Sequence, residues 1–489
     1  MQIGRELEIS RRAFLQRSSQ LAAMGAASSY ALGLAGIGEA AAFSSDGGYK
    51  ALICVFLYGG NDHGNLLIPF DPTNYARYAA IRGGISEEGG GIALPRASLA
   101  GTVLMPAGGQ TLTDDITYAL APSMPRMKAR FDEGRLAPLL NVGPLLAPMT
   151  RAQYDNNSVP RPPKLFSHND QQSTWQSSQP EGSQTGWGGR MGDLAQSANT
   201  NTMFTAINAT GNAVFLSGRQ ALPYQVSSSG AVLFRPLSNS RLFGSGAAAA
   251  ALDTVLKSAS GNILAADHAT INDRSIKFGT FVNDALANAA IATDFGAGNG
   301  LAAQLRTVAG MIAARRSLGV TRQVFMVSMG GFDNHDGLIG RHEGLLAQLD
   351  FALDAFYRAT VELGVADRVT TFTASDFGRT LSSNGDGSDH GWGGHHLILG
   401  GSVNGGRFFG RAPHVSVETP DQVGRGRLLP TTSVDEYSST LALWFGVNPS
   451  DLPSISPNIG RFASSDLGFL RMSEAAATSM QPAMYGASG

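Results

Sequence analysis

The sequence predicts an α/β protein in which helices cover both faces of a mostly parallel central sheet, with loop and lid insertions. Three continuous apolar segments, at residues 49–57, 323–328 and 368–373, are typical of strands buried on both faces. Between the last two lies an amphipathic segment at 344–364, which predicts a helix. A strand–helix–strand order of this kind indicates parallel neighbouring strands.

Shorter patterns predict the elements of the first half of the chain. The glycine run 89–91 favours a glycine-punctuated hairpin over 81–105, within an inserted loop. Apolar spacing then predicts a helix at 121–134, and a compact apolar run predicts a strand at 136–142. Because each of these elements is short, we expect them to be additions to a core that the three long strands form.

The second half of the chain contains alanine-rich stretches with helical spacing. They predict helices at 247–266 and 275–293, which we place in a lid or in the outer layer. A final helix opens within 431–437, where Ser433 is the expected N-cap and Glu436 closes a capping box. The sequence shows no internal repeat.

The N-terminus resembles an export signal. Residues 10–16 contain the pair Arg11 and Arg12, followed by a weakly apolar run at 21–37 and a small-residue cleavage site at 40–42. The alternative, a permanent membrane helix, needs about 20 predominantly apolar residues, and this run is short and rich in glycine and serine. We therefore expect export by the twin-arginine translocase to the periplasm or the exterior.

These boundaries predict the organisation of the whole chain. Residues 1–42 are the expected signal peptide, 43–470 a single α/β domain with insertions, and 471–489 a flexible tail. With 36 basic and 38 acidic residues the net charge is −2, and no basic run exists, so a nucleic-acid partner is not expected. The only cysteine, Cys54, lies in the first predicted strand, which excludes an intramolecular disulfide and disfavours thiol catalysis.

Polar side chains follow the three long predicted strands directly. Asp62 comes after the first strand, Asp333 and His335 after the second, and Asp376 after the third. Open α/β sheets build their sites at the carboxyl ends of the strands, and aspartate and histidine are common ligands of divalent metals. Each of these positions also has a purely structural interpretation. Asp62 could belong to a plain turn, Asp333 and His335 to a solvated loop, and Asp376 could cap a following turn or helix.

A glycine-rich segment at 388–396 adds three more imidazoles. Five of the nine histidines fall within one short stretch of the chain. His395 and His396 are adjacent, so on a strand they face opposite sides, and we expect His390 and His395 to be ligands and His396 to pack. The sequence thus predicts a site for one or two divalent ions (Zn, Mn, Mg or Ca) with these ligands: Asp62, Asp333, His335, Asp376, His390 and His395.

A further polar block begins at Ser167 and His168. A hydroxyl at a helix start beside a metal can act as a nucleophile, so both residues are catalytic candidates. Arg379 is a third candidate, because its guanidinium can hold a tetrahedral oxyanion bidentately. The alternatives are an ordinary loop serine and a local salt bridge.

These motifs, in this order, resemble the DUF1501 family of exported bacterial proteins. They are Leu-Tyr-Gly-Gly-Asn-Asp at 57–62, Ser-His at 167–168, Gly-Gly-Phe-Asp-Asn-His at 330–335, Asp-Phe-Gly-Arg-Thr at 376–380, Asp-His-Gly at 389–391 and Pro-Thr-Thr-Ser-Val at 430–434. The resemblance implies a fold similar to the alkaline phosphatase/sulfatase superfamily, with an alkaline-phosphatase-like core.

The resemblance also implies roles for single residues. Asp62 is similar to the superfamily's first-strand ligand, and Asp333 with His335 to its aspartate–histidine pair, although a wider spacing there keeps His342 as an alternative. Asp376 is similar to the later aspartate, but Phe377 stands where the superfamily often has histidine, a departure that argues against a full second metal site. The sulfatase nucleophile motif is absent, so ordinary sulfatase activity is not expected.

The expected function is that of an exported metal-dependent hydrolase. It would act on a phosphate or sulfate ester of a small molecule or polysaccharide, with a metal-activated hydroxyl or water as nucleophile. The alternative is an exported metal-binding or carbohydrate-associated protein that keeps the fold without turnover.

Overall fold

The structure is a computed structural model that describes residues 48–472, except 212, 232–240, 243, 258–277 and 280. The expected signal peptide and nearly all of the expected tail lie outside the described residues. Within the described part of the chain, no helix is long and apolar enough to cross a membrane.

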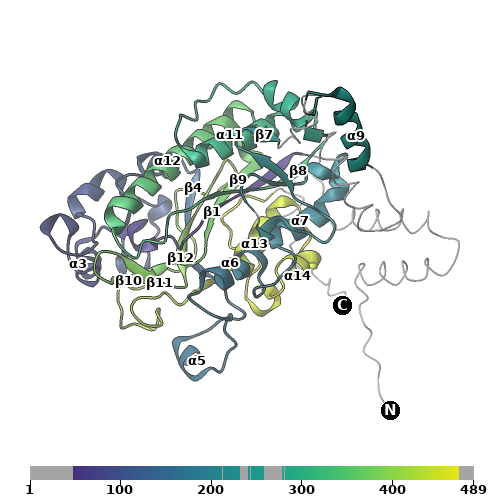
Figure 1. Cartoon of the computed structure of the whole chain (residues 1–489). Helices are drawn as coiled ribbons and strands as arrows, with labels where there is room; N and C mark the ends of the chain where they lie inside the picture. Colours follow the sequence, from purple (N-terminus) through teal and green to yellow (C-terminus); the bar gives the residue numbers. More distant parts are fainter. Residues whose placement is uncertain are drawn as a thin grey trace, which may run out of the picture.

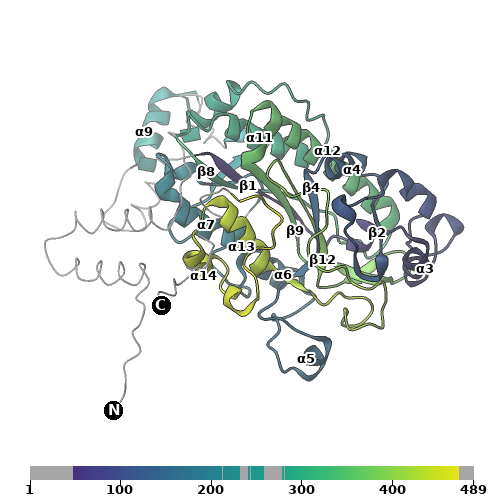
Figure 2. The same ribbon diagram turned by 180° about the vertical axis from the view of Figure 1, so that it is seen from behind.

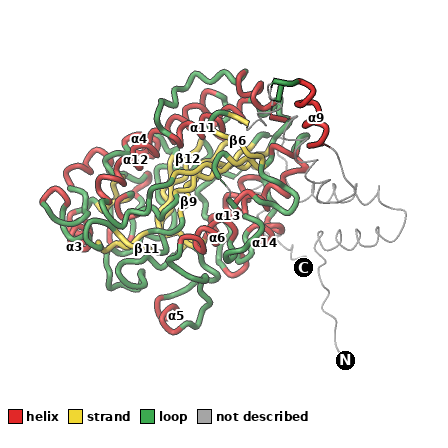
Figure 3. The backbone as a smooth tube through the Cα atoms, viewed as in Figure 1, coloured by secondary structure: helices red, strands yellow, loops and turns green. Residues whose placement is uncertain are grey.

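The central sheet is mixed and has nine strands. Figures 1 and 3 show the sheet at the centre of the molecule, between helices. The strand order is β13-β4-β12-β9-β1-β8-β5-β6-β7, and all strands run in one direction except β7 and β12. The strands are β1 (Lys50–Leu57), β4 (Leu136–Gly143), β5 (Ala206–Asn208), β6 (Tyr224–Ser227), β7 (Gly230–Ala231), β8 (Arg322–Met329), β9 (Val369–Ser375), β12 (Gly394–Gly400) and β13 (Thr432–Ser433). The predicted α/β class with a mostly parallel sheet is therefore confirmed.

Two small antiparallel pairs flank this sheet. One joins β2 (Leu67–Pro69) to β3 (Tyr118–Leu120), and the other joins β10 (Arg379–Ser383) to β11 (Ser388–His390). The second pair follows β9 directly, so its residues stand just beyond the carboxyl end of the central sheet.

Helices cover both faces of the sheet, and the two sides are seen in Figures 1 and 2. Alternate residues of β1 enter two different cores: Ile53 and Val55 pack with α4, α11 and α12, whereas Cys54 and Phe56 pack with α7, α13 and α14. The helices are α3 (Pro72–Ile81), α4 (Pro125–Asp132), α5 (Arg151–Asn156), α6 (His168–Ser177), α7 (Trp187–Ala195), α9 (Gly246–Lys257), α11 (Gly300–Ala313), α12 (Leu338–Glu362), α13 (Val434–Phe445) and α14 (Leu452–Ile455).

Cys54 lies in the middle of β1 and is buried. Burial raises the pKa of its thiol, because the thiolate would lose its hydration there. This fits the expectation that the thiol takes no part in catalysis.

The three long predicted strands are confirmed, but the prediction that the second and third of them are neighbours in the sheet is wrong. Strands β8 and β9 are parallel, as the helix between them predicted, yet they are not neighbours, because β1 lies between them and pairs with both. Every residue of β1 is buried, which suits a central position. The intervening helix α12 begins at Leu338, before the predicted 344.

Other predictions have mixed outcomes. The hairpin over 81–105 is wrong: the bridge between two of its own residues, Ile85 and Ala93, is parallel, and the segment forms 3-10 turns at Ser86–Glu88 and Arg96–Thr102. Strand β4 and the capping box of Ser433 and Glu436 on α13 are confirmed.

The remaining helix predictions are met in part. The helix expected at 121–134 is α4, shorter at both ends. Of the alanine-rich pair, α9 begins at Gly246 and is described to Lys257, and the second is helical at 281–287. The rest of both ranges lies partly outside the described residues.

Strand β12 runs against its neighbours β4 and β9. Gly394 pairs with Val142 near the end of β4, and Leu399 pairs with Leu136 at its start. The first residues of β12, and not its last, therefore lie at the edge where the parallel strands end. This direction brings the glycine-rich segment that precedes β12 to the same edge as the loops after β1, β8 and β9.

Candidate metal centre

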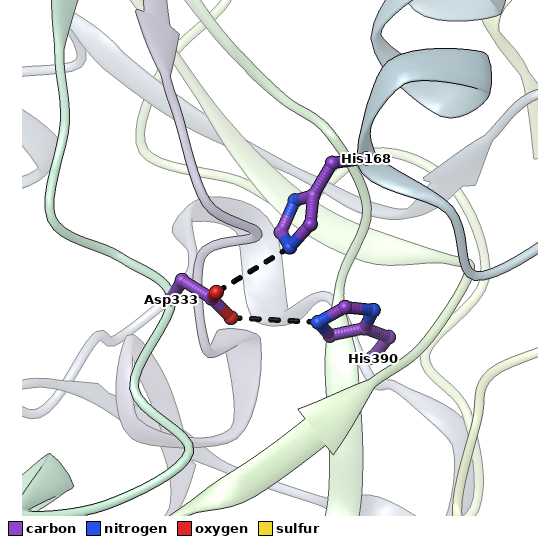
Figure 4. A group of neighbouring side chains, drawn as sticks. All are labelled: His168, Asp333 and His390. Atoms are coloured by element: carbon purple, nitrogen blue, oxygen red, sulfur yellow. Dashed lines mark ion pairs between the residues drawn. The ribbon is translucent and has the colours of Figure 1, made fainter.

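Three side chains from distant parts of the chain face one another at this edge, as Figure 4 shows. His168 is the first residue of α6, Asp333 lies in the loop after β8, and His390 ends β11. The Nε2 atom of His168 is 3.5 Å from Asp333 Oδ2, and that of His390 is 3.4 Å from Asp333 Oδ1. One ligand atom from each residue lies within 4.8 Å of those of the other two.

These spacings fit a single metal ion. With metal–ligand bonds of about 2.0–2.2 Å, two donors of a tetrahedral ion stand roughly 3.3 Å apart. Two nitrogen donors and a carboxylate oxygen that lie within 4.8 Å of one another could therefore share one ion once the side chains draw slightly closer together.

His335 offers a fourth donor to the same place. Its Nε2 atom is 3.1 Å from Asp333 Oδ1 and 2.8 Å from the Nε2 atom of His390. Both imidazoles thus direct this nitrogen toward the Asp333 carboxylate, so His335 lies beside the group of three donors formed by His168, Asp333 and His390.

Each imidazole is held from behind by an oxygen acceptor. The Nδ1 atom of His168 is 2.6 Å from Asp376 Oδ2, and that of His390 is 2.7 Å from the carbonyl oxygen of Phe166. The Nδ1 atom of His335 is 3.2 Å from Asp389 Oδ1. These acceptors suit a proton on Nδ1 of each ring when Nε2 binds a metal, an arrangement typical of metal-ligating histidines. Without an ion, the 2.8 Å contact between the Nε2 atoms of His335 and His390 requires a proton on one of those two nitrogens.

Asp376 is buried and positions His168. Its Oδ2 atom also accepts hydrogen bonds from the backbone N–H of Gly59 (3.2 Å) and from Gln172 (2.9 Å). The hydrogen bond from His168 to this carboxylate raises the pKa of His168, whereas burial lowers the pKa of His390. Asp376 thus supports the donor His168 through a hydrogen bond and does not itself belong to the group of donors.

Arg379 is buried and tied to the loops around the group. Its guanidinium contacts Asp333 Oδ1 (2.9 Å) and donates to the carbonyl oxygens of Gly59 (2.9 Å) and Ser388. Burial alone would raise the pKa of Asp333, but the hydrogen bond and charge of Arg379 outweigh it, so this pKa is lowered. The guanidinium therefore keeps Asp333 ionised and in place.

Asp62 occupies a separate, buried network. Its Oδ2 atom is 2.9 Å from the guanidinium of Arg82 and accepts a hydrogen bond from Ser388 (2.7 Å), while Oδ1 accepts from the backbone of Asn65 (3.0 Å). Burial would raise the pKa of Asp62, but Arg82 and neighbouring groups hold it well below its usual range. The cation beside Asp62 in this structure is Arg82.

The two adjacent histidines of β12 point to opposite sides, as strand geometry predicts. His395 accepts a hydrogen bond from the backbone N–H of Asn141 (3.1 Å) and lies 5.0 Å from His63, ring to ring. His396 packs 4.7 Å from the ring of Trp175 on the other side. Neither belongs to the group around Asp333.

Ser167 and Phe377 complete the account of the predicted residues. The hydroxyl of Ser167 donates to Asp170 (2.8 Å). The ring of Phe377 lies 4.9 Å from His168 and 4.7 Å from His390, and so forms an apolar wall beside them. Gly60 has a φ of +82°, and a Cβ there would come within 2.3 Å of the Phe377 ring, so this position needs glycine.

The structure thus brings together Asp333, His335 and His390, which the sequence proposes as ligands, with His168, which it proposes as catalytic. It adds two acceptors that the sequence did not single out, Asp389 and the carbonyl of Phe166. Asp389 could have been suspected from its place beside His390. Phe166 has a φ of +73°, a strained value for a bulky residue, and no sequence signal indicates it.

Comparison with known proteins identifies a family for most of the chain. Residues 49–434 match a family model whose description reads "Protein of unknown function (DUF1501)". Comparison with curated proteins found no match.

Proposed function

We propose that this chain, which belongs to the DUF1501 family, is an exported metal-dependent hydrolase of phosphate or sulfate esters. The observation that carries the proposal is the arrangement of three imidazoles around Asp333. Each ring has its Nδ1 atom held by an oxygen and its Nε2 atom directed at the same carboxylate. A merely structural cluster of histidines has no need for this uniform orientation.

The donor set favours a borderline metal. Imidazole nitrogens with one carboxylate oxygen suit Zn²⁺ or a similar transition ion better than Mg²⁺ or Ca²⁺, which prefer oxygen donors. His168, His335, His390 and Asp333 would hold the ion. When bound, it would supply Lewis-acid polarisation of an ester oxygen and a lowered pKa for a coordinated water.

Exposure of the donors supports access by a substrate. The side chains of Asp333 and His335 are 46% and 44% exposed, whereas the supporting Arg379 and Asp376 are fully buried. A rigid, buried support beneath an open group of ligands is what a site that exchanges substrate requires.

The contacts of Ser167 favour water as the nucleophile. Its hydroxyl is bonded to Asp170, and the described partners of the three imidazoles' Nδ1 atoms are oxygens of Asp376, Asp389 and Phe166, with no hydroxyl among them. A water molecule bound at the exposed donors could itself attack the ester, so the reaction would need no side-chain nucleophile.

The ester class and an alkaline-phosphatase-like core are the finer parts of the proposal. They rest on the resemblance of the strand-end motifs to the alkaline phosphatase/sulfatase superfamily, which is an analogy at the level of the fold. The mixed α/β sheet with polar residues at one edge supports the analogy. The ester would belong to a small molecule or a polysaccharide.

Hydrolysis assays test this function. The purified protein should release aryl alcohol from an aryl phosphate or an aryl sulfate when Zn²⁺ or Mn²⁺ is present, and a chelator should abolish the release. Stoichiometric metal binding without hydrolysis of either ester would instead favour the alternative, a non-catalytic exported metal-binding or carbohydrate-associated protein. The observation that favours this alternative is that the described partners of the imidazoles' Nδ1 atoms include no side-chain hydroxyl.

Export by the twin-arginine route is part of the same proposal. Arg11 and Arg12 carry it, together with the weakly apolar run that follows. Changing both to lysine should leave uncleaved precursor in the cytoplasm, as fractionation and immunoblotting would show. Unchanged export of the double variant would contradict the assignment.

A further inference from the structure

A polar hollow lies at the opposite edge of the sheet from the candidate metal centre. It measures about 530 Å³, and no apolar side chain lines it. The lining residues are Glu133, Gly134, Arg135, Asn404, Gly405, Arg407 and Arg471. Its volume falls in the range of small-molecule sites, roughly 300–1,000 Å³, but its polar lining suits a charged ligand and not an apolar one.

Two of its arginines converge on one backbone oxygen. Arg135 donates to the carbonyl oxygen of Gly401 (2.8 Å), and the guanidinium of Arg471 donates to the same atom. The backbone of Arg471 is fixed as well, because its N–H donates to Ser402 (2.8 Å). Two like charges are thus held close together by the fold, an arrangement that an anion would stabilise.

Little negative charge offsets these cations. Glu133 is already paired with Arg130 at 2.6 Å, and Asp367 stands 3.8 Å from Arg135 with a side chain that is 78% exposed. Arg407 is exposed and has no ion-pair partner among the described residues. The hollow therefore has an excess of positive charge.

We propose that this hollow binds a ligand with two or more phosphate or sulfate groups, held by Arg135, Arg407 and Arg471. Planar guanidinium groups bind such oxygens bidentately, and three of them around one hollow suit more than one anionic group. The ligand class is a polyanion such as a polyphosphate or a sulfated or phosphorylated oligosaccharide.

The site is independent of the proposed hydrolase centre. Strand β12 has its first residue at the metal-centre edge and ends at Gly400, beside the hollow. Seven residues of strand span roughly 20 Å, so one edge can bind without the other. Failure of the hydrolase proposal would leave this one standing.

Calorimetric titration of the purified protein with tripolyphosphate, at constant ionic strength, tests the proposal. We expect saturable binding that Arg407→Glu weakens by about 10-fold or more, because a charged hydrogen-bond donor becomes a repelling carboxylate. Arg407 is exposed, so the folded state should be unaffected, and circular dichroism checks this. The matched control is Arg306→Glu, the same charge change at an exposed position on α11.

Two outcomes would overturn the site. One is the absence of saturable binding of both tripolyphosphate and anionic vesicles to the unaltered protein, and the other is equal weakening by the Arg306 and Arg407 variants, which would indicate a general charge effect. Vesicles that contain phosphatidylglycerol distinguish the source of the phosphate. Vesicle binding that Arg407→Glu abolishes, without binding of tripolyphosphate, would contradict a soluble ligand and assign a lipid headgroup.

Discussion

Replacing Asp333 with asparagine should abolish stoichiometric metal binding and lower ester hydrolysis by at least about 100-fold. Asp333 is the one residue that all three imidazoles share, since Oδ2 faces His168 and Oδ1 faces His335 and His390. Loss of a residue that merely supports a ligand costs about 10–100-fold in metal affinity or activity, and loss of a ligand should exceed this. Metal content by mass spectrometry and the aryl ester assay measure the two effects.

The same loop offers a matched control. Asp336 is 71% exposed, and among the described residues its one ion-pair partner is Arg341 on the surface, so Asp336→Asn should keep its metal and its activity. Because Asp333 also contacts Arg379, thermal unfolding of both variants should be compared, to separate loss of metal from loss of fold. A full complement of metal in folded Asp333→Asn would refute the assignment of this centre.

Replacing Arg82 with methionine should lower the free energy of unfolding by about 3–5 kcal/mol, the usual cost of removing one partner of a buried ion pair. Arg82 and Asp62 are both buried, with 2.9 Å between the guanidinium and the carboxylate. Arg82 also donates to the carbonyl oxygens of Thr380 and Leu381, each at 3.3 Å. Urea denaturation provides the measurement.

Two companion variants and a pH series sharpen this test. Adding Asp62→Asn should recover part of the loss, because no uncompensated charge then remains buried. Arg358→Met removes a cation that is 44% exposed, and should cost less than about 1 kcal/mol. The lowered pKa of Asp62 stabilises the fold above its unfolded pKa of about 3.9, so the gap between Arg82→Met and the original protein should narrow as the pH falls below that value. An Arg82→Met protein as stable as the original would contradict the role of this pair.

The sequence predicted the fold best where the pattern was longest. The runs at 49–57, 323–328 and 368–373 became β1, β8 and β9 because strands buried on both faces need a continuous apolar sequence. The order of those strands was less accessible, since the position of β1 between the other two depends on contacts across the whole sheet. The glycine-rich segment at 81–105 has no hydrophobic periodicity from which a helix or strand could be predicted, and in the structure it forms tight turns.

The candidate site was predictable in its residue types but not in its partnerships. An aspartate after a buried strand looks the same in sequence whether it faces a metal or an arginine. Asp62 differs from Asp333 because Arg82, at the end of α3, folds back onto it. His168 was proposed as catalytic because it belongs to the polar block that begins at Ser167, whereas its place beside Asp333 depends on where α6 starts. The carbonyl of Phe166 was beyond sequence reasoning, since any residue has a carbonyl.

The reversed direction of β12 has a consequence for the synthesis of the chain. The donors belong to three segments, near residues 168, 333 and 390, and the last is positioned only when β12 has entered between β4 and β9. During translation most of the polypeptide must leave the ribosome before the group around Asp333 can form. Contacts between such distant residues form slowly, and an ion that binds only the finished arrangement stabilises the native state alone. Metal capture would then mark the completion of folding.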